Sequence, residues 1–447
     1  MAWTHTPILS LPGGNKTCYP FPMNKETIKY ILMQFHERQL PETRPRKLQL
    51  PLGTRKVVTL VGIRRVGKTF LLFDTMRRLL AQGVDKRQIL YLNFEDDRLL
   101  PLDVGDFDLI LRAHDELFPG FIDKKRYLFF DEVQNAPSWE SYIRRLHDTE
   151  KADIFVTGSS SQLLSRELAT GLRGRSISYE VFPLSFAEFL DFRAIEFTPY
   201  SAKSESEVTA AFNEYLELGG LPEVVLAEPF VRHRILKEYA DLIFYRDLIE
   251  RYNLTNAQLM RRLLQYCLTN TATLFNTNKI YNDFRSQGFA LSKDTLYKYM
   301  GHIEESFMLF LLPIADRSLR RQTINPKKLH VIDWSLAQPF LTAPDANLGR
   351  RLETALYLHW RRQREDLGYL AGEREVDLVL NPDTPELLIN SCLSLSSHPT
   401  WEREVAALQS GARQFPDAEC LLVAHDTAAR QPPANIKLVE AWRYLLT

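Results

Sequence analysis

The segment from Gly62 to Thr69, which reads GIRRVGKT, constrains the fold more than any other part of the sequence. An apolar run precedes it and an amphipathic helical pattern follows it, which predicts a buried strand, a tight loop and a helix in succession. Its two glycines allow the backbone to wrap closely, so that N–H groups point into the loop, and the following helix adds its positive dipole end. Strand, loop and helix in this order predict a phosphate-binding loop at one edge of an α/β sheet.

The loop also carries the side chains that phosphate chemistry needs. Lys68 is expected to reach the outer phosphates of ATP, and the Thr69 hydroxyl is expected to bind Mg²⁺. The other residues expected to line the nucleotide are Gly62, Ile63, Arg64, Arg65, Val66, Gly67 and Phe70. A chance match is the alternative explanation, and the flanking strand and helix patterns argue against it.

A second apolar run, Tyr127 to Phe130, ends in Asp131 and Glu132. Because the carboxyl ends of parallel strands meet at one edge of a sheet, both acids are expected near the phosphate loop. Asp131 is predicted to bind the Mg²⁺ ion, and Glu132 is predicted to be the catalytic base that orients the attacking water. Acids at strand ends are common by themselves, but this pair follows a phosphate loop. The sequence therefore predicts an ATP hydrolase.

Three further residues are candidates for catalysis. Ser159 follows another strand pattern and is expected to sense the γ-phosphate or hold the water, with a plain turn as the alternative. Arg173 and Arg175 lie in a basic segment, and an arginine supplied across a subunit interface would stabilise the transferring phosphoryl group. That role requires a homo-oligomer. The alternative for both arginines is a solvated basic loop.

Short apolar runs alternate with longer amphipathic stretches in the first part of the chain. Runs that are buried on both faces are typical of a parallel sheet covered by helices, which predicts an α/β fold with a three-layer core. The five runs are residues 57–63, 89–94, 127–130, 154–157 and 177–182. Ser185 and Glu188 have the spacing of a capping box, which predicts the start of the next helix. Helical patterns then dominate to residue 305, and mixed patterns follow to the C-terminus.

Several segments together resemble a large prokaryotic family of AAA+ ATPases that carry a C-terminal domain of unknown function. The matching segments read GIRRVGKT, LNFEDDRL, YLFFDEVQ, VTGSSSQLL, GLRGRSISYEVFPLSFAEF and GGLPEVV. The resemblance implies an AAA+ core, a helical lid, a winged-helix unit and a restriction-endonuclease-like piece. These domains are expected at residues 23–190, 191–255, 256–345 and 346–447. Residues 1–22 show no period and are expected to be a poorly ordered extension, which makes Met23 a candidate natural start.

The winged-helix unit is a candidate site for double-stranded DNA. Two helical patterns flank a turn at Gly288 to Ser292, which is the spacing of a helix-turn-helix. Basic residues that would contact phosphates are Lys293, Lys298, Arg317, Arg320, Arg321, Lys327 and Lys328. The alternative is a protein-packing module with a solvated basic face, which suits a formal net charge of zero.

The last piece is expected to be a nuclease fold that has lost its chemistry. Glu353 falls on a helical pattern, and Asp377 falls on a strand pattern. Such a nuclease needs a further acid and a lysine on the next strand to hold Mg²⁺ and a water. Asn390 and Cys392 stand at those two positions, and neither supplies the missing charge. Cleavage is therefore not expected, unless a shift of register brings in Glu386.

Composition excludes several other classes of protein. No apolar run approaches the roughly 18 residues that a membrane helix needs, and no signal-peptide pattern is present, so a cytoplasmic protein is expected. The four cysteines form no CxxC pair, which argues against a zinc site or a disulfide framework. Zero net charge gives no overall attraction for nucleic acid, so any such binding must come from a local patch.

These patterns favour an ATP-driven switch or motor whose AAA+ core is coupled to the winged-helix unit. The first alternative is an ATP-gated DNA-binding or defence-signalling switch with little turnover. The second alternative is an ATP-dependent nuclease.

Overall fold

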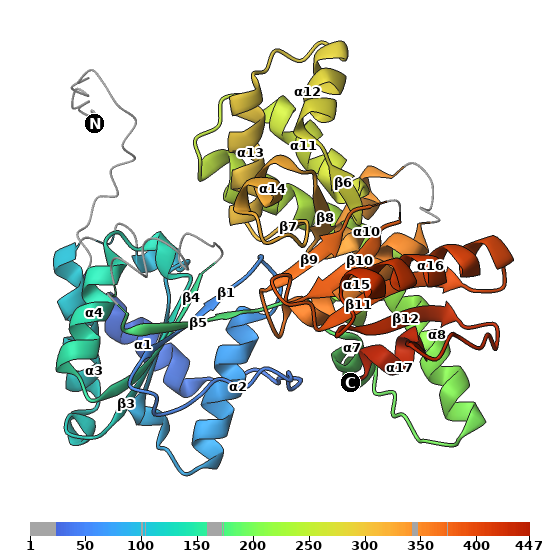
Figure 1. Ribbon diagram of the computed structural model, residues 1–447. Coiled ribbons are helices and arrows are strands. Elements are labelled where there is room, and N and C mark those ends of the chain that lie inside the picture. The colour runs from blue at the N-terminus through green and yellow to red at the C-terminus, as the bar shows by residue number, and fades with distance from the viewer. Residues whose placement is uncertain are drawn as a thin grey trace.

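The computed structural model describes residues 24–99, 102, 104–158, 172, 174–341, 347–372 and 374–447. Figure 1 shows the first sheet with its helices beside a second group that contains two further sheets. The predicted extension over residues 1–22, together with Ser159 and Arg173, lies outside the described residues. Within these described ranges, no helix is long and apolar enough to span a membrane.

The five predicted apolar runs form one parallel sheet in the order β2-β3-β4-β1-β5, which confirms the α/β class. Its strands are β1 (Val57–Val61), β2 (Ile89–Asn93), β3 (Arg126–Asp131), β4 (Ala152–Gly158) and β5 (Ser176–Glu180). The helices around it are α1 (Lys25–Glu37), α2 (Lys68–Ala81), α3 (Phe107–Leu117) and α4 (Trp139–Thr149), as Figure 1 shows. Val61 lies beside Gly158, and Asn93 lies beside Asp131, so neighbouring strands end at the same edge of the sheet.

Helices fill the next part of the chain, beginning at the predicted capping box. The Ser185 hydroxyl accepts from the Glu188 N–H, and the Glu188 carboxylate accepts from the Ser185 N–H, which confirms that prediction. The helices are α7 (Phe186–Phe192), α8 (Ala202–Leu218), α9 (Pro222–Leu226) and α10 (Pro229–Leu242). α10 continues into η6 (Ile243–Glu250), a π-helical stretch, and such turns are rare and occur frequently at functional sites.

Three helices and a three-stranded antiparallel sheet follow. The helices are α11 (Ala257–Thr269), α12 (Thr277–Ser286) and α13 (Lys293–Glu305), and α14 (Leu319–Ile324) is a short addition. The strands are β6 (Thr273–Phe275), β7 (Leu309–Leu312) and β8 (Lys327–Val331), in the order β6-β8-β7. α12 and α13 flank the predicted turn at Gly288, where φ is +89°. Lys328 contradicts its predicted role, because a side chain that is 1% exposed cannot contact DNA phosphate.

The C-terminal part is a five-stranded mixed sheet in the order β13-β12-β11-β10-β9. Its strands are β9 (Leu367–Leu370), β10 (Val376–Leu380), β11 (Leu387–Ser394), β12 (Glu419–Asp426) and β13 (Ile436–Glu440). Helices α15 (Leu348–Arg361) and α17 (Ala441–Leu445) share a hydrophobic core with one face of this sheet, and α16 (His398–Gln414) shares a separate core with the other. The 3₁₀ helices are η1 (Lys86–Gln88), η2 (Asp97–Leu99), η3 (Val104–Asp106), η4 (Pro119–Phe121), η5 (Val133–Asn135) and η7 (Trp334–Phe340).

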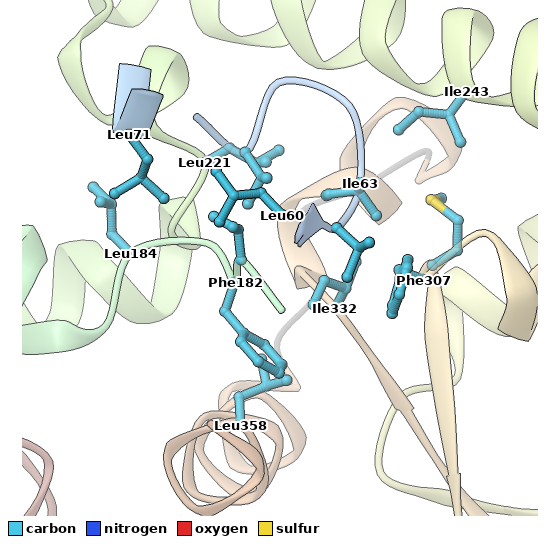
Figure 2. Close-up of a cluster of buried hydrophobic side chains, with 14 of the residues drawn as sticks. Leu60, Ile63, Leu71, Phe182, Leu184, Leu221, Ile243, Phe307, Ile332 and Leu358 are labelled. Carbon is cyan, nitrogen blue, oxygen red and sulfur yellow. The ribbon is translucent and has the colours of Figure 1, made fainter. Parts of the chain in front are cut away.

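One hydrophobic core connects the first sheet to the C-terminal half. Leu60 at the end of β1 and Ile63 in the following loop belong to the same buried cluster as Ile332 and Leu358. Figure 2 shows these side chains gathered around Phe182, which follows β5. Apolar burial stabilises a fold by roughly 25 cal/mol per Å². The loop after β1 therefore draws part of its stability from elements far along the chain.

Candidate functional site

The loop between β1 and α2 has an unusual backbone. Gly62 and Gly67 have φ angles of +146° and +103°, in the region that L side chains rarely adopt. A Cβ atom on Gly62 would lie 2.5 Å from the Val181 carbonyl oxygen, so a larger residue does not fit there. Arg65 also has a positive φ, of +65°. These angles give the curled backbone that a phosphate-binding loop needs.

Lys68 is the first residue of α2, and its side chain turns back over the loop. Its Nζ donates to the carbonyl oxygens of Gly62 and Ile63, at 3.0 and 3.1 Å, and lies 3.8 Å from Glu132 Oε1. The residue is only 4% exposed. A buried ammonium is costly unless it is well paired, so incoming phosphate oxygens would stabilise it. This position suits the predicted role of Lys68 on the outer phosphates.

Asp131 is the centre of the site and is fully buried at the end of β3. Its Oδ2 accepts from Thr69 Oγ1 at 2.8 Å and from Tyr91 Oη at 3.1 Å, and its Oδ1 accepts from the Thr157 hydroxyl. Burial raises the pKa of Asp131, and the negative charge of Glu132 raises it further, whereas the threonine hydroxyls lower it. Sequence reasoning did not predict the contacts of Tyr91 and Thr157 with Asp131, although both are polar residues within predicted strands.

Glu132 follows in a strained backbone conformation. Its φ is +52°, a left-handed conformation that costs a non-glycine residue on the order of 1–3 kcal/mol. Its N–H donates to Thr157 Oγ1 at 2.9 Å, and its Oε2 accepts from Gln134 Nε2 at 2.5 Å. The carboxylate therefore has a fixed position beside Lys68, which suits a base that holds a water.

The residues present fit both predicted ligands. The Thr69 hydroxyl and the Asp131 carboxylate lie 2.8 Å apart beside the loop, and oxygen ligands of this kind are what Mg²⁺ prefers. They would hold the ion, which would neutralise charge on the β- and γ-phosphates of ATP. The curled loop and Lys68 would hold the phosphates themselves.

Arg64 ties the loop to two distant segments. Its Nε donates to both carboxylate oxygens of Asp247 in η6, at 3.0 and 3.1 Å, and its Nη1 donates to Glu95 Oε1 at 2.8 Å. Glu95 follows β2, at the same edge of the sheet as Asp131. The Arg64–Asp247 pair spans 183 residues of sequence, so no local pattern predicts it.

Arg46 supports the same loop from the side of the N-terminal segment. Its Nη1 donates to the Val66 carbonyl at 3.1 Å, and its Nη2 donates to the Phe182 carbonyl at 2.8 Å. It also pairs with Glu188 at 2.8 Å, and both side chains are less than 10% exposed. The loop is thus fixed to β5 and α7 as well as to η6. Sequence reasoning missed Arg46, which lies outside every motif.

Two of the loop candidates, Arg65 and Phe70, face the surface, whereas Ile63 and Val66 are buried. The Arg65 guanidinium lies 5.6 Å from the centre of the Tyr239 ring on α10, which makes a second link between the loop and that helix. Phe70 is 53% exposed on the first turn of α2. It is free to contact a bound nucleotide, and its role stays a prediction.

Arg175 lies far from this site within one subunit. Its carbonyl accepts from the Val57 N–H at the start of β1, so it lies at the edge of the sheet opposite the loop, roughly 13 Å of strand away. Its Nε donates to Asp148 Oδ1 at 2.8 Å. A catalytic role for Arg175 across a subunit interface stays a prediction. Ser159 and Arg173 lie outside the described residues.

The C-terminal candidates occupy the predicted elements, namely α15 for Glu353 and β10 for Asp377. Asn390 lies opposite Asp377 and accepts from its N–H at 3.2 Å, while its own amide donates to Glu404 at 2.7 Å. Cys392 is buried, and burial raises the pKa of its thiol to about 12. Glu386 instead pairs with Arg364 at 3.0 Å on the surface.

Known proteins resemble this chain along most of its length. An AAA domain family matches residues 54–190, and a family described as a domain of unknown function (DUF8612) matches residues 209–347. An uncharacterised protein of Methanocaldococcus jannaschii is 33% identical over 379 residues, which are 83% of this chain and 82% of that protein. The chain belongs to this family of AAA-domain P-loop ATPases.

Other relatives of this AAA-domain protein are more distant. An uncharacterised protein of Haemophilus influenzae is 30% identical over 322 residues, which are 71% of this chain and 78% of that protein. Among solved structures, the Walker-type ATPase of Pyrococcus abyssi matches 72% of this chain and 97% of its own, with 14% identity and a TM-score of 0.42. The matched AAA domain contains the phosphate loop and both strand-end acids, which places the protein in the ATP-binding class.

Thr157→Val should lower the free energy of unfolding by about 1–3 kcal/mol, because a buried carboxylate loses a donor and the Glu132 N–H loses its acceptor. Urea unfolding measures this loss. Thr59→Val is the matched control: Thr59 is 1% exposed on β1, and its hydroxyl has no partner among the described residues. Equal stability losses in the two variants would contradict the assigned contacts.

Proposed function

We propose that this protein hydrolyses ATP and that its phosphate loop acts as a switch on the C-terminal half. The observation that carries the proposal is the contact of Arg64, a residue of the loop itself, with Asp247 in η6. A nucleotide that enters the loop meets this contact directly. The shared hydrophobic core beneath the loop supports the same coupling.

The chemistry needs a held nucleotide, a base and a water. Lys68 and the loop backbone bind the outer phosphates, and Thr69 with Asp131 holds Mg²⁺. Glu132 orients the water and takes its proton as the water attacks the γ-phosphorus, and the bond from that phosphorus to the β–γ bridging oxygen breaks, so that ADP leaves. The 3.8 Å separation between Glu132 and Lys68 keeps the base close to the group that grips the phosphates.

The switch follows from competition for one guanidinium. ATP phosphates, Asp247 and Glu95 are all anions within reach of Arg64, and charge-assisted contacts of arginine with phosphate are strong. Asp247 is 4% exposed, and its carboxylate forms an ion pair with the Arg64 guanidinium at 3.0 Å. When phosphates draw Arg64 away, η6 loses a contact that holds it against the loop. Because η6 continues α10, the helices that follow respond to the state of the nucleotide.

Glu132→Gln should keep ATP bound and slow hydrolysis by about 10²–10⁴-fold, because the base is lost while the phosphate and Mg²⁺ ligands remain. Lys68→Ala should instead lose ATP affinity, since it removes the fixed cation on the outer phosphates. Calorimetric ATP binding and steady-state phosphate release separate the two effects. Wild-type turnover in Glu132→Gln would assign the base to another residue.

Asp247→Asn should keep ATP binding and break the coupling. In the wild type, a slowly hydrolysed ATP analogue should change hydrogen exchange in the loop and also in residues 229–250. In the variant, only the loop should respond. Asp241→Asn is the control, because Asp241 makes an exposed pair with Arg261 at 3.0 Å, and such pairs contribute about 0–1 kcal/mol. An unchanged response of residues 229–250 in Asp247→Asn would refute the Arg64 switch.

A second candidate function is ATP-gated binding of double-stranded DNA. The supporting observation is the outer face of α13, where Lys293, Tyr297 and Lys298 are exposed after the turn at Gly288. Arg317, Arg320 and Arg321 are also exposed, around α14. A helix that follows such a turn is the element that enters the major groove in helix-turn-helix proteins.

Replacing both Lys293 and Lys298 with alanine should weaken duplex binding and reduce its salt dependence by about two phosphate contacts. Fluorescence anisotropy at several salt concentrations, with and without the ATP analogue, measures both effects. Lys203→Ala is a control, since Lys203 is an exposed lysine on α8. No duplex binding by the wild type at low salt would remove this candidate and leave the ATP switch untouched.

A further inference from the structure

Lys328 lies where the three-stranded sheet meets α15. Strand β8 directs Lys328 and His330 toward that helix, because residues two apart on a strand share a face. His330 stacks on Tyr357 of α15, with 4.2 Å between ring centres, and its Nδ1 lies 3.4 Å from Thr354 Oγ1. Lys328 is 1% exposed on this buried face. The lysine is therefore part of the contact between the small sheet and the C-terminal part.

Three carboxylates surround the Lys328 ammonium. Its Nζ lies 2.6 Å from Glu353 Oε1, 2.5 Å from Glu375 Oε1 and 3.2 Å from Asp377 Oδ1. They come from α15, from the residue before β10 and from β10 itself. All three contacts are ion pairs, and the contact with Asp377 also has the geometry of a hydrogen bond donated by Lys328.

The same three carboxylates are arranged as metal ligands. One oxygen from each lies within 4.8 Å of the others, and no other such acidic or histidine group was found in the part of the chain that the structure describes. Divalent ions bind carboxylate oxygens at about 2.0–2.6 Å, so an ion held by this set would occupy the position of the Lys328 Nζ. The ammonium and a metal ion therefore exclude one another.

The surroundings favour the ammonium. The second oxygen of Asp377 accepts from the Ser391 N–H and hydroxyl, at 2.9 and 3.1 Å, which fixes the carboxylate toward the lysine. Asn390 on the next strand adds no charge that would attract a divalent ion.

We propose that this cluster is a cation site that the protein fills with its own Lys328. The ammonium fastens the three-stranded sheet to the C-terminal part and keeps divalent metal out. Without it, Glu353, Glu375 and Asp377 become the ligands of a divalent ion. The inference concerns neither ATP nor DNA and is independent of the proposed function.

Manganese binding tests the inference directly. Lys328→Met in the full-length chain should bind one more Mn²⁺ than the wild type, counted by electron paramagnetic resonance without nucleotide, and its Tm should rise with Mn²⁺. The extra site should vanish in Lys328→Met/Asp377→Asn. Lys327→Met, at the neighbouring position on β8, should match the wild type. A folded Lys328→Met protein that gains no Mn²⁺ would overturn the proposal.

If Lys328→Met does not fold, a comparison of Mn²⁺ binding by two other proteins tests the proposal. Wild type and Asp377→Asn are then titrated with Mn²⁺ under the same conditions. Equal stoichiometry supports a site closed by Lys328. A loss of one Mn²⁺ in Asp377→Asn would show that the wild-type cluster already binds metal, which overturns the proposal.

Discussion

A carboxylate with no exposed surface must find its hydrogen-bond donors inside the protein, and Asp131 finds them on three separate elements. Thr69 comes from α2, Tyr91 from β2 and Thr157 from β4. Their contacts require the ends of β2, β3 and β4 to lie level with the start of α2. The geometry of the nucleotide site therefore depends directly on the register of the sheet.

Two arginines link the site to the rest of the molecule. The phosphate loop is bounded by Arg46 contacts on one side and by the Arg64–Asp247 pair on the other. Arg46 contacts the loop and Arg64 belongs to it, and each also forms an ion pair with a buried carboxylate outside it. Changes in the loop consequently alter the electrostatic balance of α7 or η6. In the proposed switch, these two arginines would carry a small motion at the phosphates to the helices further along the chain.

The sequence predicts the features that depend on short local patterns, and it does not predict contacts between distant segments. Apolar runs, the glycine loop and the capping box at Ser185 each depend on residues within a few positions, and the sheet and helices follow them. The Arg64–Asp247 pair depends on the packing of two segments that no short pattern connects. Lys328 was wrongly predicted to lie on the surface, because two adjacent lysines are usually exposed. The carboxylates that bury it come from segments distant in the sequence. Thr157 was within a predicted strand, but its bond to Asp131 depends on strand order.

The hydrophobic core beneath the loop limits how the gene for this protein can recombine during evolution. The matched AAA family ends at residue 190, yet Leu60 and Ile63 pack in one cluster with Ile332 and Leu358 (Figure 2). A gene fusion that joined this AAA segment to an unrelated partner would expose that apolar surface and leave Arg64 without Asp247. Recombination at this boundary is therefore disfavoured, although the family models place a border there. The two halves are expected to be inherited together and to diverge in step.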